Sequence, residues 1–283
     1  MIKEVEKMNT PINLEVNTED DLAMESISVI IPTYNRFETT ILALESALNQ
    51  SLEPDEVIIV DDGSDENVIM KLESKITGLK DNRIKLVKAN ATRHPGKARN
   101  IGIDVAQSKW IAFLDSDDLW CREKLRIQLK TMIENKSEAS CTAVLSEEQQ
   151  HKDSQIKNIR HLKTSHILAS NIIVNSSVMV SKELILSVGG VVSDYSVRGV
   201  EDYATWLRIS NKTKWLYLED PLTKYTHDSI DSIRNDSKHS NSLDVTFAHL
   251  NYFVWKARTP FDFLMIKIVR RLIQVIVTAE LKI

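Results

Sequence analysis

The chain has 283 residues, of which 42% are hydrophobic and 27% are charged, proportions that are ordinary for a globular protein. Its net charge of −4 excludes the strongly basic surface that general nucleic-acid binding requires, so we expect no nucleic-acid partner. The two cysteines, Cys121 and Cys141, have neither the number nor the spacing of a disulfide framework or a zinc site. A reducing, cytoplasmic location is therefore the simplest expectation.

The N-terminal segment, residues 1–25, is polar and acidic and contains no apolar run of the kind found in signal peptides. We expect this segment to be flexible. Residues 26–235 have the pattern of one α/β domain, and residues 236–283 are expected to form a C-terminal helical extension.

Apolar strands alternate with helices about every 25 residues in the first half of the chain, which predicts βαβ units and a mainly parallel sheet. The expected strands are 27–31, 57–60, 83–87 and 110–114. Three helices are expected between these strands. The first follows Arg36, the second spans residues 65–77, and the third begins after Pro95-Gly96. Beyond residue 120 the pattern predicts three helices, over 123–135, from Val200 onward and over 242–258. It also predicts a flexible loop over 146–165, a strand over 171–180, and short strands at 215–218 and 223–226.

Polar clusters follow three of the predicted strands: PTYNR after the first, DDGS after the second and DSDD after the fourth. Ligands of open α/β sheets bind beyond the carboxyl ends of the strands, so we expect the three clusters to share one site. The DSDD cluster lies in the segment WIAFLDSDDLW, residues 110–120, and its carboxylates repel one another. Hard oxygen ligands at such a place suit Mg²⁺ or Mn²⁺ shared with substrate phosphates. The alternative is an acidic turn that caps the next helix.

Five segments match a known family in order and spacing: ISVIIPTYNR, EVIIVDDGSDE, ARNIGI, WIAFLDSDDLW and GVEDYATWLR. Over residues 27–230 the chain therefore resembles glycosyltransferase family 2, whose members are inverting, nucleotide-sugar-dependent enzymes with the GT-A fold. The resemblance implies that residues 26–235 form a GT-A domain, a Rossmann-like mixed, mainly parallel sheet flanked by helices. It also implies a divalent cofactor, Mn²⁺ or Mg²⁺, a nucleotide-sugar donor and a glycan or lipid-linked acceptor.

The resemblance implies that a group of residues at the strand ends and on the third helix binds the nucleotide-sugar. These are Pro32, Thr33, Tyr34, Arg36, Asp61, Asp62, Arg99, Asn100, Asp115 and Ser116. Tyr34 would contact the base by stacking or by its edge. Asp62 would accept a hydrogen bond from the imide N–H of the base, which favours uracil, and Asp61 would support that loop.

Asp115 and Asp117 would form the family's Asp-x-Asp, with Asp115 nearer the ribose and Asp117 as the direct metal ligand. The third carboxylate of the cluster, Asp118, would cap the next helix. One segment departs from the family, because TRHPG, residues 92–96, stands before Arg99 where the family often has Asn-x-Gly. Contacts from the TRHPG segment are therefore left open.

A general base is expected on the side of the sugar opposite the diphosphate, because the acceptor hydroxyl must lose a proton as it attacks. The segment GVEDYATWLR places Asp202 at a helix start, and the resemblance implies that this aspartate faces the acceptor. The alternative is that Glu201 and Asp202 only cap the helix. His227 would reach the diphosphate or the metal, with a surface histidine as the alternative.

These features predict a metal-dependent, inverting glycosyltransferase that uses a UDP-sugar in the assembly of surface polysaccharide or glycolipid. A nucleotidyltransferase also combines acidic clusters with Mg²⁺, but such enzymes usually carry a glycine-rich, basic phosphate loop after the first strand. The segment PTYNRFETT has no such loop. A non-catalytic module that binds nucleotide-sugars is the third alternative, and the intact acidic motifs argue against it.

Residues 261–279 have an amphipathic helical pattern that is apolar apart from one narrow polar stripe. The stripe consists of Lys267, Arg270, Arg271, Gln274 and Thr278. Its basic residues exclude a membrane-spanning helix, because each costs roughly 2.5–3.5 kcal/mol at the centre of a bilayer. Two alternatives stay open for the apolar face: packing on the domain or on a second subunit in a homodimer, and peripheral contact with a membrane surface.

Overall fold

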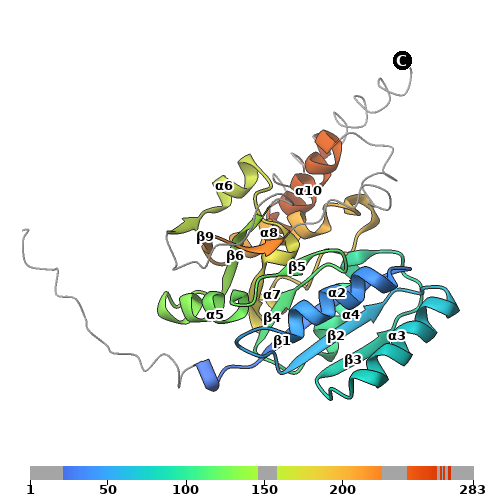
Figure 1. The fold of residues 1–283 in the computed structure, drawn as a ribbon. Coiled ribbons are helices and arrows are strands. Elements are labelled where there is room, and N and C mark those ends of the chain that lie inside the picture. Colours follow the sequence, from blue (N-terminus) through green and yellow to red (C-terminus); the bar gives the residue numbers. More distant parts are fainter. Residues whose placement is uncertain are drawn as a thin grey trace, which may run out of the picture.

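The computed structural model describes residues 22–145, 158–224 and 241–259, together with Asp262, Leu264, Lys267 and Ile268. The expectations for residues 1–21, for His227 and for most of 261–279 therefore lie outside the described residues. In the described part a single sheet runs through the molecule, with helices on both of its faces (Figure 1).

The first half of the sheet confirms the predicted βαβ pattern. Its four strands pair in parallel in the order β3-β2-β1-β4. The strands are β1 (Ile27–Thr33), β2 (Glu56–Asp61), β3 (Ile84–Lys88) and β4 (Trp110–Phe113). The helices that connect them are α2 (Phe37–Leu48), α3 (Glu66–Leu79) and α4 (Pro95–Val105). Because the strands are parallel, the three polar clusters lie at the same edge of the sheet.

Alternate side chains of these strands pack into two cores, one on each face of the sheet. The core beneath α2 and α3 includes Val29, Ile31, Val57, Ile59, Leu44 and Leu72. The core beneath α4 includes Ile30, Ile58, Val60, Ala98 and Ile103. Because β1, β2 and β4 are buried on both faces, they form nearly continuous apolar runs in the sequence, and this makes them easy to predict.

Beyond β4 the sheet continues with strands from the second half of the chain. In spatial order these are β8 (Met179–Ser181), β6 (Ala139–Leu145), β9 (Trp215–Lys224) and β5 (Leu119–Trp120), and β7 (Ile159–Leu162) also pairs with β9. Of the described pairings here, the one between β6 and β9 is parallel and the others are antiparallel. The sheet is thus mixed: the four strands of the first half pair with one another in parallel, and most pairings of the second half are antiparallel.

The predicted helices of the second half are confirmed as α5 (Lys124–Glu134), α8 (Glu201–Ser210) and α10 (Asn241–Lys256). Large side chains hold α8 in place. The ring of Trp206 packs edge-to-face on Trp215 with 5.4 Å between centroids, and it lies 5.9 Å from the ring of Phe113. The Tyr203 hydroxyl on α8 lies 2.7 Å from Nε2 of His249 on α10. This packing fixes the first turn of α8 relative to the sheet.

Several expectations for the second half are wrong. The strand expected over 171–180 is replaced by the 3₁₀ turn η1 (Asn175–Ser177) and the three-residue β8, because polar side chains of η1 bind nearby backbone groups. The Ser177 hydroxyl, for example, donates to the Val174 carbonyl at 2.7 Å. Within the expected loop 146–165, residues 159–165 form β7 and the start of α6 (Thr164–Ala169).

The remaining differences concern strand ends and continuity. The two short strands expected at 215–218 and 223–226 are one strand, β9, which runs through Pro221. Its pairing with β6 shifts register on both sides of Ala143, so the proline falls at an irregularity where its missing N–H is tolerated. β6 itself was not expected. Leu22 is buried, and Glu25 accepts a hydrogen bond from the Trp110 indole at 2.7 Å, so these two residues contact the sheet domain.

Between β8 and α8 lie the short helix α7 (Lys182–Ser187) and the 3₁₀ turn η2 (Tyr195–Val197).

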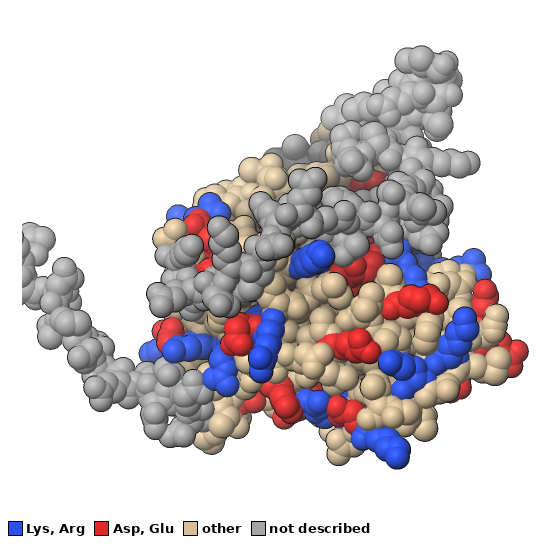
Figure 2. All heavy atoms as spheres, viewed as in Figure 1, with Lys and Arg blue, Asp and Glu red and all other residues tan. Residues whose placement is uncertain are grey.

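No helix within the described ranges is long and apolar enough to cross a membrane. On the face shown in Figure 2, basic and acidic side chains are interspersed, as expected for a chain with 36 Lys and Arg against 40 Asp and Glu.

Candidate active site

The loops that follow β1 and β2 are joined by hydrogen bonds at the carboxyl edge of the sheet. The Asp62 N–H donates to the Thr33 carbonyl at 2.9 Å. Asn35 has a φ of 51°; its N–H donates to the Ser64 hydroxyl, and its side-chain oxygen accepts from the Asp65 N–H, both at 2.8 Å. The PTYNR and DDGS clusters therefore form one hydrogen-bonded unit.

The buried Asp61 carboxylate holds the DDGS loop from inside. It accepts hydrogen bonds from the N–H groups of Gly63 at 3.2 Å and Ser64 at 3.0 Å, and from the Ser64 hydroxyl. Gly63 has a φ of +84°, and a Cβ at this position would lie 2.6 Å from Ala91 Cβ. Both the conformation and the close approach therefore require glycine.

Asp62 binds the TRHPG segment, whose contacts the sequence left open. Its carboxylate accepts from the Thr92 N–H at 2.6 Å, the Thr92 hydroxyl at 3.0 Å and the His94 N–H at 3.1 Å. The buried His94 ring accepts from the Gly96 N–H at Nδ1, and its Nε2 lies 3.2 Å from the Asp194 carbonyl. Since Nδ1 accepts, Nε2 carries the proton and donates to Asp194. The segment thus joins Asp62 to the loop before α8.

Of the nucleotide contacts predicted at the end of β1 and just after it, Tyr34 has the most exposed side chain. It is 40% exposed, and the Arg93 guanidinium lies 5.7 Å from its centroid. Pro32 is half-buried. The Thr33 hydroxyl is buried and lies 2.7 Å from the Thr40 hydroxyl on α2. The Thr33 hydroxyl is therefore directed to α2, whereas the Tyr34 ring is open to solvent.

Asp115 and Asp117 have different cationic partners. Asp115 Oδ1 accepts from Arg99 Nη2 at 2.7 Å and from Asn175 Nδ2 at 2.8 Å. Asp117 forms an ion pair with Arg36. Burial and the neighbouring Asp115 raise the pKa of the Asp117 carboxyl, and Arg36 offsets part of this rise. The two carboxylates thus lie together with both charges partly compensated.

Asp118 does not cap a helix, contrary to expectation. Its buried carboxylate accepts from the Ser176 hydroxyl at 2.5 Å, and the Ser176 oxygen accepts from the Asp115 N–H at 2.9 Å. β5 intervenes before α5 begins at Lys124, so Asp118 is too far from that helix to cap it. Ser116 is also buried.

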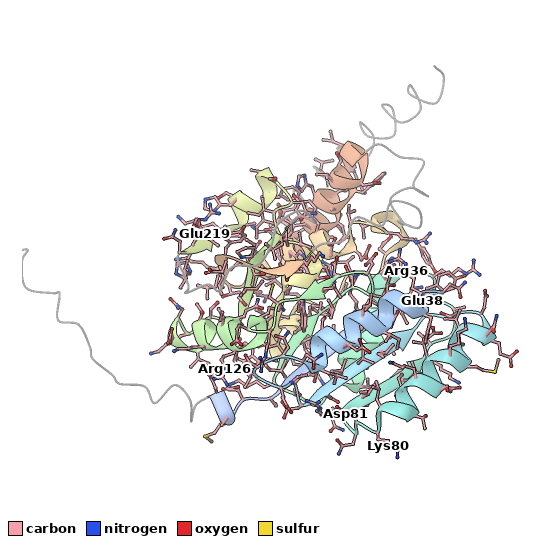
Figure 3. All side chains as sticks on the ribbon, viewed as in Figure 1. Arg36, Glu38, Lys80, Asp81, Arg126 and Glu219 are labelled. Atoms are coloured by element: carbon pink, nitrogen blue, oxygen red, sulfur yellow. The ribbon has the colours of Figure 1, made fainter. Side chains whose placement is uncertain are left out.

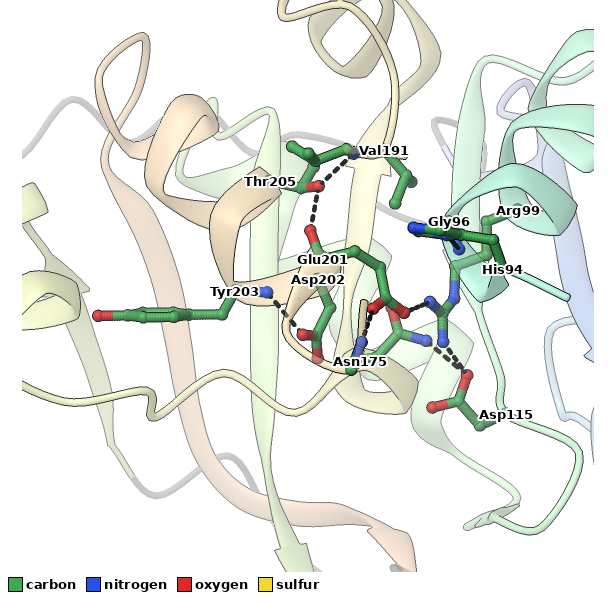
Figure 4. Close-up of polar contacts among 12 residues, drawn as sticks. His94, Gly96, Arg99, Asp115, Asn175, Val191, Glu201, Asp202, Tyr203 and Thr205 are labelled. Carbon is green, nitrogen blue, oxygen red and sulfur yellow. Dashed lines mark hydrogen bonds and ion pairs between the residues drawn. The ribbon is translucent and has the colours of Figure 1, made fainter. Parts of the chain in front are cut away.

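Arg99 connects the acidic strand end to the first turn of α8 (Figure 4). Besides its bond to Asp115, it donates from Nη1 to Glu201 Oε1 at 2.8 Å, and its side chain is only 7% exposed. Glu201 Oε2 also accepts from the Gly199 N–H at 2.6 Å. Burial lowers the pKa of Arg99, but attraction by Asp115 and Glu201 outweighs burial, so the pKa is raised. A fixed positive charge therefore bridges two carboxylates.

Asp202 lies next to this bridge on α8 (Figure 4). Burial and, second, repulsion by Glu201 raise the pKa of its carboxyl to about 6, against the attraction of Arg99. Its Oδ1 accepts from the Tyr203 N–H at 2.6 Å. The N-cap of α8 is Val200, and no side chain caps it. Glu201 is used on the Arg99 bridge, and Asp202 has the protonation behaviour of a candidate general base.

Asn100 does not join the Arg99 bridge. Its Nδ2 donates to the Val191 carbonyl and its Oδ1 accepts from the Val191 N–H, each at 2.8 Å, so its amide fixes the loop before η2. Two residues that contact Asp115, Asn175 and Ser176, were missed in the sequence. Their one signal was a polar triplet, NSS, inside a segment that otherwise resembles a strand.

Gly96 sets how closely α4 approaches α8. A Cβ at this position would lie 2.3 Å from the Val192 carbonyl oxygen and 3.2 Å from Glu201 Cγ. Gly96→Ala is therefore expected to lower the free energy of unfolding by about 1–3 kcal/mol through overpacking. Gly78→Ala in α3 is the control, because nothing lies within 4 Å of the place that its methyl group would take, and alanine favours the helix by up to about 1 kcal/mol. Equal urea midpoints for the two variants would contradict the close approach.

Comparison with known proteins shows to which family this chain belongs. Residues 28–180 match the model for glycosyl transferase family 2. The putative teichuronic acid biosynthesis glycosyltransferase TuaG of Bacillus subtilis is 32% identical over 204 residues, which cover 70% of this chain and 78% of that protein. The Escherichia coli UDP-Glc:alpha-D-GlcNAc-diphosphoundecaprenol beta-1,3-glucosyltransferase WfaP is 38% identical over 109 residues, 38% of this chain and 42% of that protein. Relatives with 41–47% identity are matched over 15–44% of their own length.

Solved structures show the same fold. Staphylococcus aureus TarS 1–349 in complex with UDP-GlcNAc superimposes with a TM-score of 0.66 at 19% identity, covering 81% of this chain and 66% of that chain. The mannosyltransferase PcManGT from Pyrobaculum calidifontis, in complex with GDP-Man and Mn²⁺, gives a TM-score of 0.61 at 17% identity, covering 88% and 70%. The mixed sheet with its polar carboxyl edge is the GT-A fold of glycosyltransferases. The chain belongs to glycosyltransferase family 2.

Proposed function

We propose that this chain transfers a sugar from a UDP-sugar to an acceptor hydroxyl, with inversion at the anomeric carbon. The observation that carries the proposal is the ion-paired bridge from Asp115 through Arg99 to Glu201. The bridge sets the acidic strand end, where the donor would bind, beside the helix turn that carries Asp202. In-line displacement needs the donor and a proton acceptor held in such a fixed relation.

The pathway proposed is the assembly of a cell-surface polysaccharide or glycolipid on the cytoplasmic side. The names of two relatives support it: TuaG is named for teichuronic acid biosynthesis, and WfaP for transfer from UDP-Glc to a diphosphoundecaprenol-linked sugar. The acceptor of this chain is accordingly proposed to be a glycan or a lipid-linked sugar. Residues 26–235 are proposed as the transferase domain. The start of the C-terminal extension, α10, packs on α8 of that domain.

The oxygen ligands of the site fit a divalent cation that is shared with the nucleotide-sugar. Asp115 and Asp117 offer hard carboxylate oxygens, and the described residues contain no cluster of three or more His, Cys, Asp or Glu side chains that could hold a metal by themselves. Mg²⁺ is commonly bound by one or two carboxylates together with substrate phosphates. We propose Asp117 as the direct ligand, with Asp115 nearer the ribose and His227 as a further candidate. When bound, Mn²⁺ or Mg²⁺ neutralises the charge that develops on the departing diphosphate.

The protein's own groups would supply the remaining steps. Asp202, ionised above pH 6, would take the proton of the attacking hydroxyl. Arg99 would hold the Glu201 carboxylate in place, because it donates to Glu201 Oε1 at 2.8 Å. Tyr34 would contact the base, and the remaining acceptor capacity of Asp62 would bind an imide N–H of uracil.

Two buried atoms beside Asp115, Arg99 Nε and Asn175 Oδ1, have no hydrogen-bond partner among the described residues, so a bound polar ligand or water would satisfy them.

The metal assignment is tested with Asp117→Ala. This variant is expected to abolish Mn²⁺-dependent binding of UDP-glucose and UDP-GlcNAc in thermal-shift and calorimetric titrations, while circular dichroism shows an intact fold. Asp81→Ala is the matched control, because Asp81 has a similar exposure, 21% against 23%, and also pairs with an arginine. Full transfer of sugar in excess chelator would contradict the metal assignment. A wild-type protein that binds no nucleotide-sugar with Mn²⁺ would contradict the proposed function itself.

A further inference from the structure

Arg36 forms an ion pair with Asp117, the carboxylate that the proposed function assigns to the metal. Its Nη1 contacts Asp117 Oδ2, and the two side chains are 22% and 23% exposed. Arg36 immediately precedes α2, at the carboxyl edge of the sheet (Figure 3). The contact therefore joins the loop after β1 to the loop after β4.

The two arginines of the site are held very differently. Arg99 is bound by two carboxylates, Asp115 and Glu201, and its side chain is 7% exposed. Arg36 lies at the surface end of the site and is about three times as exposed. An arginine with such access to solvent can change partners at low cost, whereas Arg99 cannot leave without exposing two buried charges.

A guanidinium and a divalent cation cannot share Asp117 without cost. Two positive charges on one carboxylate repel each other, and the repulsion is doubled when one of them is a divalent ion. A cation at Asp117 therefore disfavours the contact between Arg36 and this carboxylate. The diphosphate of a donor offers Arg36 a new partner in the same place, because arginine binds phosphate oxygens in a bidentate manner.

We propose, resting on the proposed function, that Arg36 is an exchangeable counter-ion of Asp117. It neutralises this carboxylate in the donor-free protein and moves to the donor's diphosphate when the cation takes Asp117. The cation alone then competes with Arg36 and binds weakly. The nucleotide removes the competitor, so cation and nucleotide bind with positive coupling, and each raises the affinity for the other by the same factor.

The test measures Mn²⁺ binding to the full chain by electron paramagnetic resonance, with and without UDP. Arg36→Gln is expected to bind Mn²⁺ alone about tenfold more tightly than the wild type, at the lower end of ordinary coupling energies. The increase in Mn²⁺ affinity that UDP causes in the wild type should shrink by a similar factor in this variant. Arg36→Lys, which keeps the charge, should retain most of the competition.

Arg83→Gln is the matched control, because Arg83 pairs with Asp81 at similar exposure, 24% and 21%, at the amino end of β3. Figure 3 shows the Asp81 label well apart from that of Arg36. This variant should bind Mn²⁺ as the wild type does. If Arg36→Gln binds Mn²⁺ alone no more tightly than the wild type, the exchange is wrong even though the wild type binds UDP with Mn²⁺. If the wild type binds no UDP in the presence of Mn²⁺, the proposed function fails, and the exchange fails with it.

Discussion

Asp202→Asn is expected to reduce sugar transfer by about 10²–10⁴-fold, the usual contribution of a general base. Asparagine keeps the shape and the hydrogen bond to the Tyr203 N–H but cannot take up the proton. Donor affinity should hardly change, because the lost interaction is made with the acceptor. Initial rates with saturating UDP-sugar, combined with calorimetric donor titrations, separate the two effects.

The pH dependence should show the same carboxyl group. Because the pKa of Asp202 is raised to about 6, mainly by burial, transfer should increase as pH rises through 6. Stability should change in the opposite direction. The folded protein keeps this proton up to pH 6, whereas the unfolded chain releases it near its ordinary pKa of about 3.9. The group therefore contributes stability below pH 4 that is lost as pH rises to 6, and Asp202→Asn should remove this part of the pH dependence.

Glu201→Gln distinguishes the two acidic residues at the start of α8. It weakens the bond to Arg99 but leaves Asp202 in place, so transfer should fall less than in Asp202→Asn. If Asp202→Asn transfers sugar at nearly the wild-type rate and Glu201→Gln is inactive, the base assignment is reversed. If both variants stay active, the base lies elsewhere in the chain.

Arg99→Met is expected to lower the free energy of unfolding by about 3–5 kcal/mol, the usual cost of removing one partner from a buried ion pair. The substitution leaves Asp115 and Glu201 without their shared cation, and the Glu201 side chain is only 5% exposed. Transfer should be lost as well, because the two carboxylates then repel each other and Asp202 moves with α8. Urea unfolding and a transfer assay measure the two losses.

Two companion variants show whether the bridge itself is responsible. Arg99→Met combined with Glu201→Gln removes the more deeply buried of the two unpaired charges and should regain part of the lost stability. Arg99→Lys should be intermediate, because one ammonium cannot reproduce the fork that reaches two carboxylates. A wild-type urea midpoint for Arg99→Met would contradict the structural role of the bridge.

Three strands of the first half, β1, β2 and β4, could be predicted because burial on both faces makes them nearly continuous apolar runs. In the second half this signal fails. β8 has three residues, and β9 contains Glu219, Asp220 and Pro221, which break the pattern. Its residues are set by their pairing with β6, β7 and β5, and such long-range pairing leaves no local periodicity in the sequence.

Individual site residues could be predicted from their motifs, but their partners could not. Arg99 and Glu201 are separated by 102 residues, and Asp115 and Asn175 by 60. The sequence places each at the end of an element without stating which charge faces which. The capping alternative for Glu201 arose for this reason, since an acidic residue at a helix start has the same local pattern whether it caps the helix or binds a distant arginine.

The hydrogen bonds that Thr92 and His94 donate to Asp62 have a consequence for changing the donor specificity of this protein. A substitution of Asp62 that aims at another nucleotide also releases the segment whose imidazole reaches Asp194. If Asp62 binds the base as proposed, a change of base preference therefore also disturbs the contact between the TRHPG segment and the loop before α8. A mutant library that varies Asp62 alone should yield mostly unstable proteins. An evolutionary change of nucleotide would require a compensating substitution in the TRHPG segment.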